Sequence, residues 1–459
     1  MKIHRLRLFL LSLLTIPAFA SEEQKPAPPP AEAVTRDFRG TNGVVIKAAI
    51  IDKTDAEAVL ATRDGKRMKV ALDNLVEEDR AYVKSWSKEE DVFLRKCRRL
   101  SIRQCLELRG YESFEFRFDG NHIMIDGKVN GKPARMMADT GAHTLLHDGF
   151  AKSAGLEVGP MTEKIYGVAG EQEAGWTAVP SFQIGEAVFK DRKILAADMN
   201  KDRPPGSKSN YDLLLGADFM NQLDGVISYP EQRIFFRPDR SDEDAAGGST
   251  DFRLFKTKDG KVMRGKVVSK TPTVATLKLV NGRESQMPVS NFIEADQTYL
   301  NAWTEEGALF MEHCGGLSVE DILRLRSYQS FQIRRVPHSK HVYVDGTLND
   351  HKVTYCIDTG AFNSLLHIDA AKRYGCDVGP MDQEVWGIGG VQPAAAVKID
   401  KITLGSCVLT NRKLLAADLF RGDATDEDHG WIGLFGGDFM RELEAYITYT
   451  EDRFFLIQR

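Results

Sequence analysis

The stretch Asp139-Thr140-Gly141-Ala142 decides the interpretation of this 459-residue chain, because it recurs as Asp358-Thr359-Gly360-Ala361. Each copy follows a strand-like run and is followed within a few residues by a Leu-Leu-His triplet. Two carboxyl groups held close together cannot both ionise cheaply, so they share one proton. One carboxylate can then act as a base on a water molecule while the other acts as an acid on an amide. Such a pair requires two equivalent loops, and this chain supplies two.

The repeat extends over most of the chain. Positions matched at one constant spacing, the repeat offset, include Phe38 and Phe255, Trp86 and Trp303, and Cys97 and Cys314. Self-similarity at one offset over such a length indicates a tandem duplication. A chain of 459 residues is also too long for a single hydrophobic core, so several domains are expected.

The composition excludes some classes of partner. Hydrophobic residues make up 42% of the chain and charged residues 28%, which is ordinary for a soluble globular protein. The formal net charge of −5 is spread along the chain without long basic runs. Nucleic acid and an anionic membrane surface are therefore not expected as partners.

The N-terminal segment (1–20) has the pattern of a secretory signal peptide. It consists of a basic start (Lys2, Arg5 and Arg7), a mostly apolar run (8–16) and a small-residue cleavage site (Ala18-Phe19-Ala20). The apolar run is shorter than the roughly 20 residues that span a bilayer. We expect export, to a periplasm or as a secreted protein, with no membrane anchor after cleavage. An uncleaved anchor helix is the alternative.

The chain contains six cysteines, which are Cys97, Cys105, Cys314, Cys356, Cys376 and Cys407. Cysteines in an exported chain favour disulfide bonds. Only Cys97 and Cys314 are matched by the duplication, so the sequence does not select a pairing. Buried free thiols remain the alternative.

Residues 36–87 and 253–304 each combine short strand-like runs, a tight turn and a helix with two aromatic residues. The motif residues are Asp73, Asn74, Asp79, Tyr82 and Trp86 in the first copy and Ser290, Asn291, Asp296, Tyr299 and Trp303 in the second. These segments resemble the SH3-like homology domain first described in a yeast endocytic adaptor. The resemblance implies a small β-barrel with a peptide ligand. Alternatively, the aromatic pair at i and i+4 only packs the helix onto the barrel.

Two further pairs of motifs follow the Asp-Thr-Gly-Ala stretches in the same order. Tyr166-Gly167-Val168-Ala169-Gly170 and Trp386-Gly387-Ile388-Gly389-Gly390 each place an aromatic residue before close glycines. Leu215-Gly216 and Phe435-Gly436 come later in each half. With these motifs the two halves resemble the retropepsin-like and pepsin-like aspartic proteases, as two single-lobe units.

The resemblance implies an exported aspartic endopeptidase that acts on a peptide or protein substrate without a metal or another cofactor. Asp139 and Asp358 would be the catalytic pair. The active-site loops would be supported by Thr140, Gly141, Thr359 and Gly360, with the threonines hydrogen-bonded across the pair. Two flaps over the substrate would be formed by Tyr166, Gly167, Gly170, Trp386, Gly387 and Gly390. The residues packed beneath the loops would be Leu215, Gly216, Phe435 and Gly436.

Other chemistries lack support, because the sequence holds no His-Glu-x-x-His, Gly-x-Ser-x-Gly or Gly-x-x-x-x-Gly-Lys motif. Five polar residues are instead predicted to cap helices that follow them: Asn74, Ser101, Asp218, Ser318 and Asp438. His147 and His367 are assigned packing or surface positions.

The predicted fold class is mainly β, as a tandem duplication of an SH3-like small barrel plus a retropepsin-like acid-protease lobe, with short helical connectors. The predicted segments are a signal peptide (1–20), a Pro-rich linker (21–35), SH3-like barrel 1 (36–87), a helical connector (88–110), lobe 1 (111–238), a linker (239–252), SH3-like barrel 2 (253–304), a second helical connector (305–327) and lobe 2 (328–459).

Two questions stay open at the level of sequence. The lobes can pair within one chain, giving a monomer, or each lobe can pair with its twin in a homodimer. A tether raises the effective concentration of the lobes and favours the monomer. The chain can also be a catalytically silent, peptide-binding scaffold of duplicated modules. In that case each Asp-Thr-Gly is a tight turn whose aspartate caps a neighbouring amide.

Overall fold

The computed structural model describes residues 35–168, 170–185, 187–201, 210–237, 253–335, 341–420 and 429–458. The chain divides after Ser85 into two compact units. The predicted signal peptide and the predicted linker at 239–252 lie outside the described residues. Within the described ranges, no helix combines the length and the apolar character needed to cross a bilayer.

The first unit is a small antiparallel sheet with one helix, and its strands pair in the order β1-β2-β3-β4. The elements are β1 (Arg36–Arg39), β2 (Val45–Lys53), β3 (Glu57–Thr62), β4 (Arg67–Ala71), the 3-10 helix η1 (Leu72–Asn74) and α1 (Glu77–Ser85). Phe38 is buried, and its ring lies 6.2 Å from the ring of Tyr82 on α1. Because α1 begins at Glu77 and Asn74 belongs to η1, the prediction that Asn74 caps this helix was wrong.

A second sheet repeats the first at the same sequence spacing. Its elements are β16 (Arg253–Lys256), β17 (Val262–Lys270), β18 (Val274–Leu279), β19 (Glu284–Pro288), the 3-10 helix η3 (Val289–Asn291) and α7 (Glu294–Ala302). A buried aspartate ties the first strand to the helix in both copies. Asp79 accepts the Arg39 N–H at 2.7 Å, and Asp296 accepts the Lys256 N–H at 2.8 Å. The duplication therefore extends to buried polar contacts.

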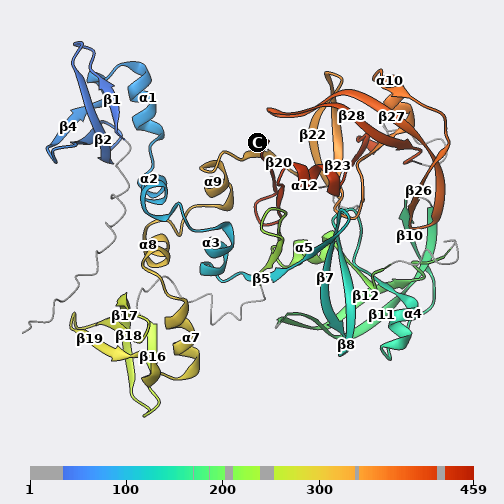
Figure 1. Cartoon of the computed structure of the whole chain (residues 1–459), viewed down its shortest axis with the longest axis horizontal. Helices are drawn as coiled ribbons and strands as arrows, with labels where there is room; N and C mark the ends of the chain where they lie inside the picture. The colour runs from blue at the N-terminus through green and yellow to red at the C-terminus, as the bar shows by residue number, and fades with distance from the viewer. Residues whose placement is uncertain are drawn as a thin grey trace, which may run out of the picture. The chain divides into compact units, whose positions relative to one another are not determined.

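Short helices from both halves of the chain form one helical module in the second unit (Figure 1). They are α2 (Lys88–Val92), the π-helix η2 (Phe93–Cys97), α3 (Ile102–Leu108), α8 (Glu305–His313) and α9 (Val319–Arg324). Ser101 and Ser318 begin α3 and α9 with capping boxes, which confirms both predicted caps. The apolar core of the module includes Phe93 and Phe310, whose rings meet edge to face at 6.3 Å.

Lobe 1 is built on an eight-stranded sheet in the order β10-β11-β12-β9-β13-β8-β7-β6. Its elements are β6 (Arg117–Asp119), β7 (His122–Val129), β8 (Lys132–Asp139), β9 (Leu145–His147), α4 (Asp148–Ser153), β10 (Glu163–Gly167), β11 (Gly170–Ile184), β12 (Ala187–Ala197), β13 (Leu213–Gly216) and α5 (Ala217–Gln222). Strand β11 also pairs with β7, which closes part of the sheet into a barrel. The turn between β7 and β8 is made by Asn130 and Gly131, with φ angles of 49° and 78°.

Lobe 2 repeats this arrangement in the order β21-β22-β23-β29-β24-β28-β27-β25, with β26 paired to β27. Its elements are β21 (Arg334–Arg335), β22 (Val342–Leu348), β23 (His351–Ile357), β24 (Leu365–His367), α10 (Ile368–Arg373), β25 (Asp377–Val378), β26 (Gln383–Gly387), β27 (Gly390–Leu404), β28 (Cys407–Ala417), β29 (Gly433–Phe435) and α12 (Gly437–Glu442). Strands β22 and β27 pair to close this barrel. The protein is therefore mainly β, as the sequence predicts.

A six-stranded sheet joins the two lobes in the order β20-β31-β30-β14-β15-β5. Lobe 1 supplies β5 (Glu112–Glu115), β14 (Val226–Ser228) and β15 (Arg233–Phe236), and lobe 2 supplies β20 (Gln329–Gln332), β30 (Tyr446–Thr448) and β31 (Arg453–Leu456). The lobes meet at β14 and β30, where Ile227 is opposite Ile447. Both isoleucines are fully buried, and one apolar core runs through both lobes.

Strand β13 positions the loop that begins at Asp139. It lies between β8, to which it runs parallel, and β9, to which it runs antiparallel. The loop therefore leaves the sheet at the end of β8 and returns as β9 around the end of β13. In lobe 2, β29 lies between β23 and β24 in the same way. Each Asp-Thr-Gly stretch is thus supported from below by a buried strand, β13 or β29, which we call the wedge strand of its lobe.

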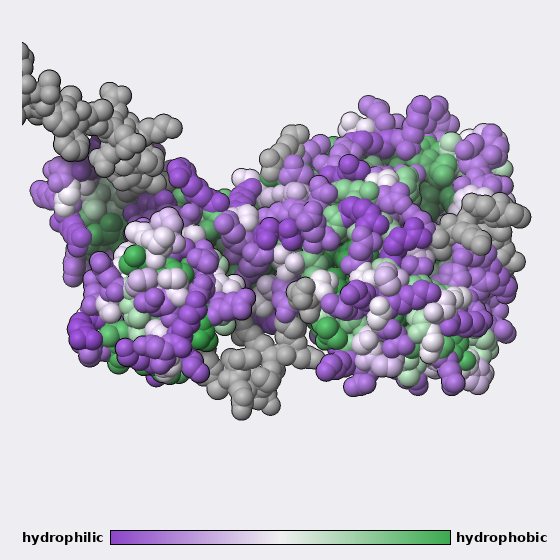
Figure 2. All heavy atoms as spheres, turned by 60° about the horizontal axis from the view of Figure 1, so that its bottom comes forward, coloured by the Kyte–Doolittle hydropathy of each residue, from purple (hydrophilic) through white to green (hydrophobic). Residues whose placement is uncertain are grey.

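Hydrophilic side chains cover most of the face drawn in Figure 2, and the hydrophobic patches between them are small and separate. Exposed large apolar residues include Val44, Leu254 and Met381, which come from distant parts of the sequence. Isolated apolar side chains of this kind are usual on globular proteins.

Replacement of Phe310 by alanine should destabilise the helical module. The ring is fully buried against Phe93, so its loss leaves a cavity that costs roughly 3–5 kcal/mol. Thermal unfolding should show a lower midpoint for Phe310→Ala. The adjacent Met311 is 46% exposed, and Met311→Ala should leave the midpoint nearly unchanged. Equal effects of the two substitutions would contradict the packing described.

Candidate active site

The structure brings the two Asp-Thr-Gly loops face to face. A methyl group placed on Gly141 would lie 2.5 Å from Cγ of Asp358, and one placed on Gly360 would meet the carboxyl group of Asp139. The carboxyl groups of Asp139 and Asp358 are also within hydrogen-bonding reach of each other. Glycine is required at both positions because the aspartate of the opposite lobe occupies the space of a side chain.

Thr140 and Thr359 exchange hydrogen bonds across the pair. The Thr140 hydroxyl accepts the Thr359 N–H at 3.0 Å and donates to the Ile357 carbonyl at 2.8 Å. The Thr359 hydroxyl accepts the Thr140 N–H at 3.0 Å and donates to the Ala138 carbonyl at 2.8 Å. Both threonines are fully buried. Each loop therefore satisfies buried polar groups of the other.

The four residues expected beneath the loops are buried there: Leu215, Gly216, Phe435 and Gly436. A side chain on Gly216 would collide with the backbone between His143 and Thr144. The Gly216 N–H also donates to the Thr144 hydroxyl at 3.1 Å. The backbone of the wedge strand at Gly216 thus contacts the active loop directly, and the contact is too close for any side chain at this position.

Asp218 and Asp438 do not cap helices, contrary to the prediction. Helices α5 and α12 begin after glycines and have no side-chain cap hydrogen bond. Asp218 instead accepts the N–H and the hydroxyl of Thr144, both at 2.8 Å. Asp438 accepts the same two groups of Ser364, at 2.9 and 2.7 Å. The two carboxylates anchor the far ends of the active loops. A signal for this role existed in the sequence, because a hydroxyl residue precedes each aspartate by 74 positions.

Two hairpin tips meet across the cleft, at the end of β10 and β11 and at the end of β26 and β27. Figure 1 shows β10 and β26 side by side. A methyl group on Gly167 would lie 2.6 Å from Cβ of Ile388, and one on Gly387 would meet Val168. Val168 packs against an apolar cluster of lobe 2, and Ile388 packs against one of lobe 1. Gly170 lies in the same contact, against Gly389, while Gly390 closes the second tip by pairing with Gly387.

The hairpins and the carboxyl pair line a partly open cavity of about 630 Å³. Asp139 and Asp358 lie in its wall together with Tyr166 and Trp386, whose side chains are 71% and 42% exposed. Apolar residues of both lobes also line it, namely Met137, Leu214, Leu365 and Leu434. The structure thus places four of the predicted flap residues around one space with the predicted dyad: Tyr166, Gly167, Trp386 and Gly387.

The two carboxyl groups differ in their surroundings. Burial raises the pKa of Asp139 well above its ordinary value of 3.8, and the charge of Asp358 and a hydrogen bond with it raise this pKa further. Asp358 accepts the N–H groups of Gly360 at 2.9 Å and Ala361 at 3.1 Å. Asp139 accepts the N–H of Gly141 at 3.0 Å. We therefore assign the shared proton to Asp139 and the negative charge to Asp358.

The loops differ by one residue, and the difference affects the wall of the cleft. Their first turns match, because the N–H groups of Ala142 and Ala361 each donate to the carbonyl of their own loop's aspartate at 3.3 Å. The second loop then carries Phe362, whose carbonyl accepts from the Asn121 side chain of lobe 1 at 2.8 Å. The longer loop leaves the carboxyl pair in place and adds an aromatic ring to the cavity wall.

Two histidines beside the pair were not predicted. His122 and His341 each precede the aspartate of their own lobe at the same spacing, a regularity that the sequence already contains. His122 lines the cavity, and its ring packs edge to face on Phe362 at 5.2 Å. His341 hydrogen-bonds to the backbone of Gly141, and its burial lowers its pKa below 6.5. Each histidine thus touches the active loop of the opposite lobe.

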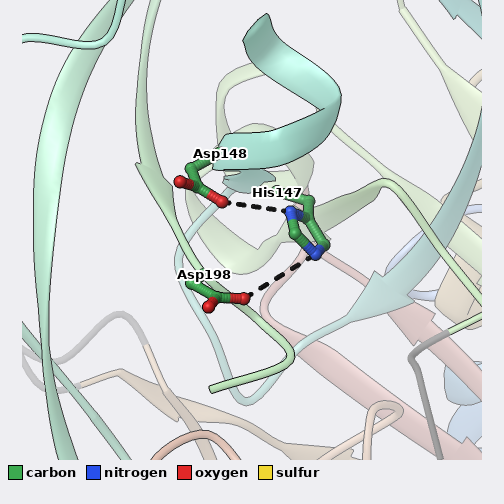
Figure 3. A group of neighbouring side chains, drawn as sticks. All are labelled: His147, Asp148 and Asp198. Carbon is green, nitrogen blue, oxygen red and sulfur yellow. Dashed lines mark ion pairs between the residues drawn. The ribbon is translucent and has the colours of Figure 1, made fainter. Parts of the chain in front are cut away.

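A His-Asp-Asp group in lobe 1 consists of His147, Asp148 and Asp198 (Figure 3). None of the three is among the residues that line the cavity. Nδ1 of His147 is 3.3 Å from Asp148, and Nε2 is 3.9 Å from Asp198. Their side-chain atoms are close enough together to ligate a metal ion. However, Nδ1 accepts the Gly149 N–H at 3.0 Å, and Asp148 pairs with Lys152 at 2.9 Å. We assign the group a structural role at the start of α4. His367, the equivalent residue of lobe 2, is buried and accepts the Leu419 N–H at 3.2 Å.

Comparison with known families agrees with this geometry. The family model described as aspartyl protease matches the chain twice, at residues 125–219 and 344–439. Each match includes one Asp-Thr-Gly loop and the wedge strand beneath it. The chain therefore contains two aspartyl protease domains, one in each lobe. No curated protein matches the chain in sequence.

Two solved structures are similar to parts of the chain. A retropepsin-like aspartic protease from Rickettsia conorii is 20% identical, and the match covers 28% of this chain and 91% of that one, with a TM-score of 0.22. An aspartic proteinase from Irpex lacteus is 11% identical, and the match covers 76% of this chain and 97% of that one, with a TM-score of 0.36. No comparison bears on the SH3-like resemblance, which stays a prediction.

Thr140→Val should separate the role of the hydroxyl from that of side-chain shape. The substitution leaves the Thr359 N–H and the Ile357 carbonyl buried without these partners, at a cost of about 2–5 kcal/mol. Denaturant unfolding should show this loss. Thr140→Ser keeps the hydroxyl and should recover most of the stability, whereas a serine variant as unstable as the valine variant would contradict the exchange described.

The raised pKa of Asp139 should make stability depend on pH. The folded protein holds a proton that the unfolded chain releases above its ordinary pKa of 3.8. The stability linked to this proton is complete below that value and is lost as pH rises through the raised pKa. The unfolding midpoint of the wild type should therefore fall relative to Asp139→Asn between about pH 4 and 8. A constant difference across this range would contradict the assignment.

Proposed function

We propose that the chain is an exported aspartic endopeptidase that hydrolyses peptide bonds with a water molecule activated by Asp139 and Asp358. The observation that carries this proposal is the approach of these two carboxyl groups, from equivalent loops, to within hydrogen-bonding reach. The two aspartyl protease domains support it, because each contributes one aspartate. Asp139 and Asp358 come from the two lobes of a single chain, so a monomer suffices for the site.

The proposed reaction uses the unequal protonation of the pair. Ionised Asp358 takes a proton from the water molecule while the water oxygen attacks the peptide carbonyl carbon. At the same time Asp139 gives its proton to the carbonyl oxygen. In the second step Asp358 gives the proton to the leaving nitrogen as the C–N bond breaks. Asp139 recovers a proton from a hydroxyl of the tetrahedral intermediate. The pair thus returns to its starting state with one proton on Asp139.

The cleft fits an extended peptide segment as the substrate. Its volume of about 630 Å³ exceeds that of one amino-acid side chain, and apolar residues flank the carboxyl pair in both lobes. The hairpin tips touch through Gly167 and Ile388, so they must separate to admit a chain. When they close again, they exclude bulk water from the reaction.

The contacts of the two SH3-like sheets favour packing over the binding of a peptide ligand. The Arg36 guanidinium covers the ring of Tyr82 at 4.1 Å, and Arg253 covers Tyr299 at 4.5 Å. These arginines also pair with the buried aspartates, Asp79 and Asp296. The contacts favour a packing role for the two tyrosines.

The proposal that the chain is exported rests on the N-terminal segment (1–20), whose pattern also predicts that no membrane anchor remains after cleavage.

Asp139→Asn and Asp358→Asn should each abolish peptide cleavage. Each substitution removes one half of the acid–base pair, so kcat should fall by roughly 10³-fold or more. The mature protein would be incubated with an unfolded protein substrate between about pH 4 and 7. New peptides would be counted by mass spectrometry.

Asp126→Asn provides the matched control, because this aspartate of lobe 1 is 68% exposed and pairs only with Arg117 among the described ion pairs. This variant should cleave like the wild type. If the wild type binds peptides but never cleaves them, the chain is a silent scaffold. Loss of activity in only one of the two dyad variants would indicate that lobes pair with their twins in another chain.

A further inference from the structure

Cys97 and Cys314 lie together in the core of the helical module. They are equivalent positions of the duplication, at the end of η2 and at the end of α8. Both are fully buried. The Cys97 thiol donates to the Glu306 carbonyl at 3.7 Å, and the Cys314 thiol donates to the Glu89 carbonyl at 3.4 Å. The two glutamates are also separated by the repeat offset.

Other contacts of the module show the same two-fold exchange between the halves. Arg109 donates to the Leu317 carbonyl, and Arg326 donates to the Leu100 carbonyl. Each bond is the image of the other at the repeat offset. These paired bonds relate the two halves by an approximate two-fold axis. A side chain can contact its own equivalent in the other half only where both lie close to this axis. The thiols of Cys97 and Cys314 meet this condition, because both lie in the one apolar core of the module and are close enough for the two side chains to interact directly.

We propose that Cys97 and Cys314 form a disulfide bond when the chain folds in an oxidising compartment, and that this bond cross-links the two halves of the protein. Two thiols already in contact need only a small movement of the Sγ atoms to reach bonding distance. Cys105 is the remaining cysteine of the module core. Elsewhere, Cys376 and Cys407 accept hydrogen bonds from Asn349 and Gln329 in lobe 2.

The reaction needs a disulfide donor, such as oxidised glutathione or a thiol–disulfide oxidoreductase. The thiolate of one cysteine attacks the donor's disulfide, which forms a mixed disulfide and releases one donor thiol. The thiolate of the second cysteine then attacks the first Sγ, forms the Sγ–Sγ bond and displaces the second donor thiol. Two electrons and two protons have then passed from the cysteines to the donor.

Because both thiols are buried in the folded protein, the thiol–disulfide exchange must occur while the chain folds. Burial raises the pKa of both thiols, that of Cys314 to about 12, so neither is a ready nucleophile in the folded protein. Full burial also keeps a donor away from both sulfur atoms. The bond therefore forms during folding, before the module closes. It closes the long loop of chain between the two cysteines and so restricts the unfolded chain.

Refolding with and without a donor tests the proposal independently of catalytic activity. The full chain would be unfolded, reduced, and refolded with or without oxidised glutathione, then denatured and alkylated with N-ethylmaleimide. Without glutathione all six cysteines should be alkylated, and with it four. Peptide mapping without reduction should find one cross-linked pair, which contains Cys97 and Cys314. Six alkylated cysteines after oxidative refolding, or a cross-link to another cysteine, would overturn the proposal.

Cys105→Ala is the matched control, because Cys105 is a buried thiol of the same core. This variant should keep the cross-link, whereas Cys97→Ala and Cys314→Ala should lose it. Oxidised wild type should unfold at a midpoint roughly 5 °C or more above the reduced form, and glutathione should not shift the midpoint of Cys314→Ala. Should the alanine variants not fold, the peptide map and the two wild-type midpoints decide the matter. Equal wild-type midpoints would show that the bond does not hold the halves together.

Discussion

The exchange of hydrogen bonds between Thr140 and Thr359 is the interaction on which the rest of the structure depends. Each hydroxyl binds a backbone N–H and a backbone carbonyl of the opposite lobe. A lobe without its partner would lose these bonds together with the burial of strands at the joining sheet. Gly141 and Gly360 also make each lobe depend on the other, because the space beside each glycine is filled by the carboxyl group of the opposite lobe. Neither lobe is complete alone.

This mutual completion explains how two nearly identical loops acquire different chemistry. A pair of carboxyl groups in contact holds one proton, so the two aspartates cannot be in the same state. Small differences then decide which aspartate carries the charge. Asp358 accepts two backbone N–H groups where Asp139 accepts one. The second loop, which is one residue longer, carries Phe362 and so extends this asymmetry to the wall of the cleft.

The sequence predicted those features that depend on local patterns. The Asn130-Gly131 turn and the capping boxes at Ser101 and Ser318 are short-range signals, and the structure contains them. The Asp-Thr-Gly loops were found because the duplication shows them twice. The duplication also indicated the order of barrel, connector and lobe, although the SH3-like nature of the barrels is untested.

The remaining features depend on contacts between distant residues, which no local pattern contains. Asp218 looks like a helix cap in sequence, yet it binds Thr144, which lies 74 residues earlier. His341 reaches the loop of the other lobe at Gly141. Repeated spacings in the two halves, such as that between each histidine and its aspartate, could have indicated some of these contacts.

The most direct test of a dyad shared between two lobes of one chain is the peptidase activity of an equimolar mixture of Asp139→Asn and Asp358→Asn proteins. Within each such chain one member of the pair is missing, so the account predicts that the mixture remains as inactive as its components. Activity that appears on mixing would show that lobes of different chains combine to form the site, and it would contradict a dyad assembled within a single chain.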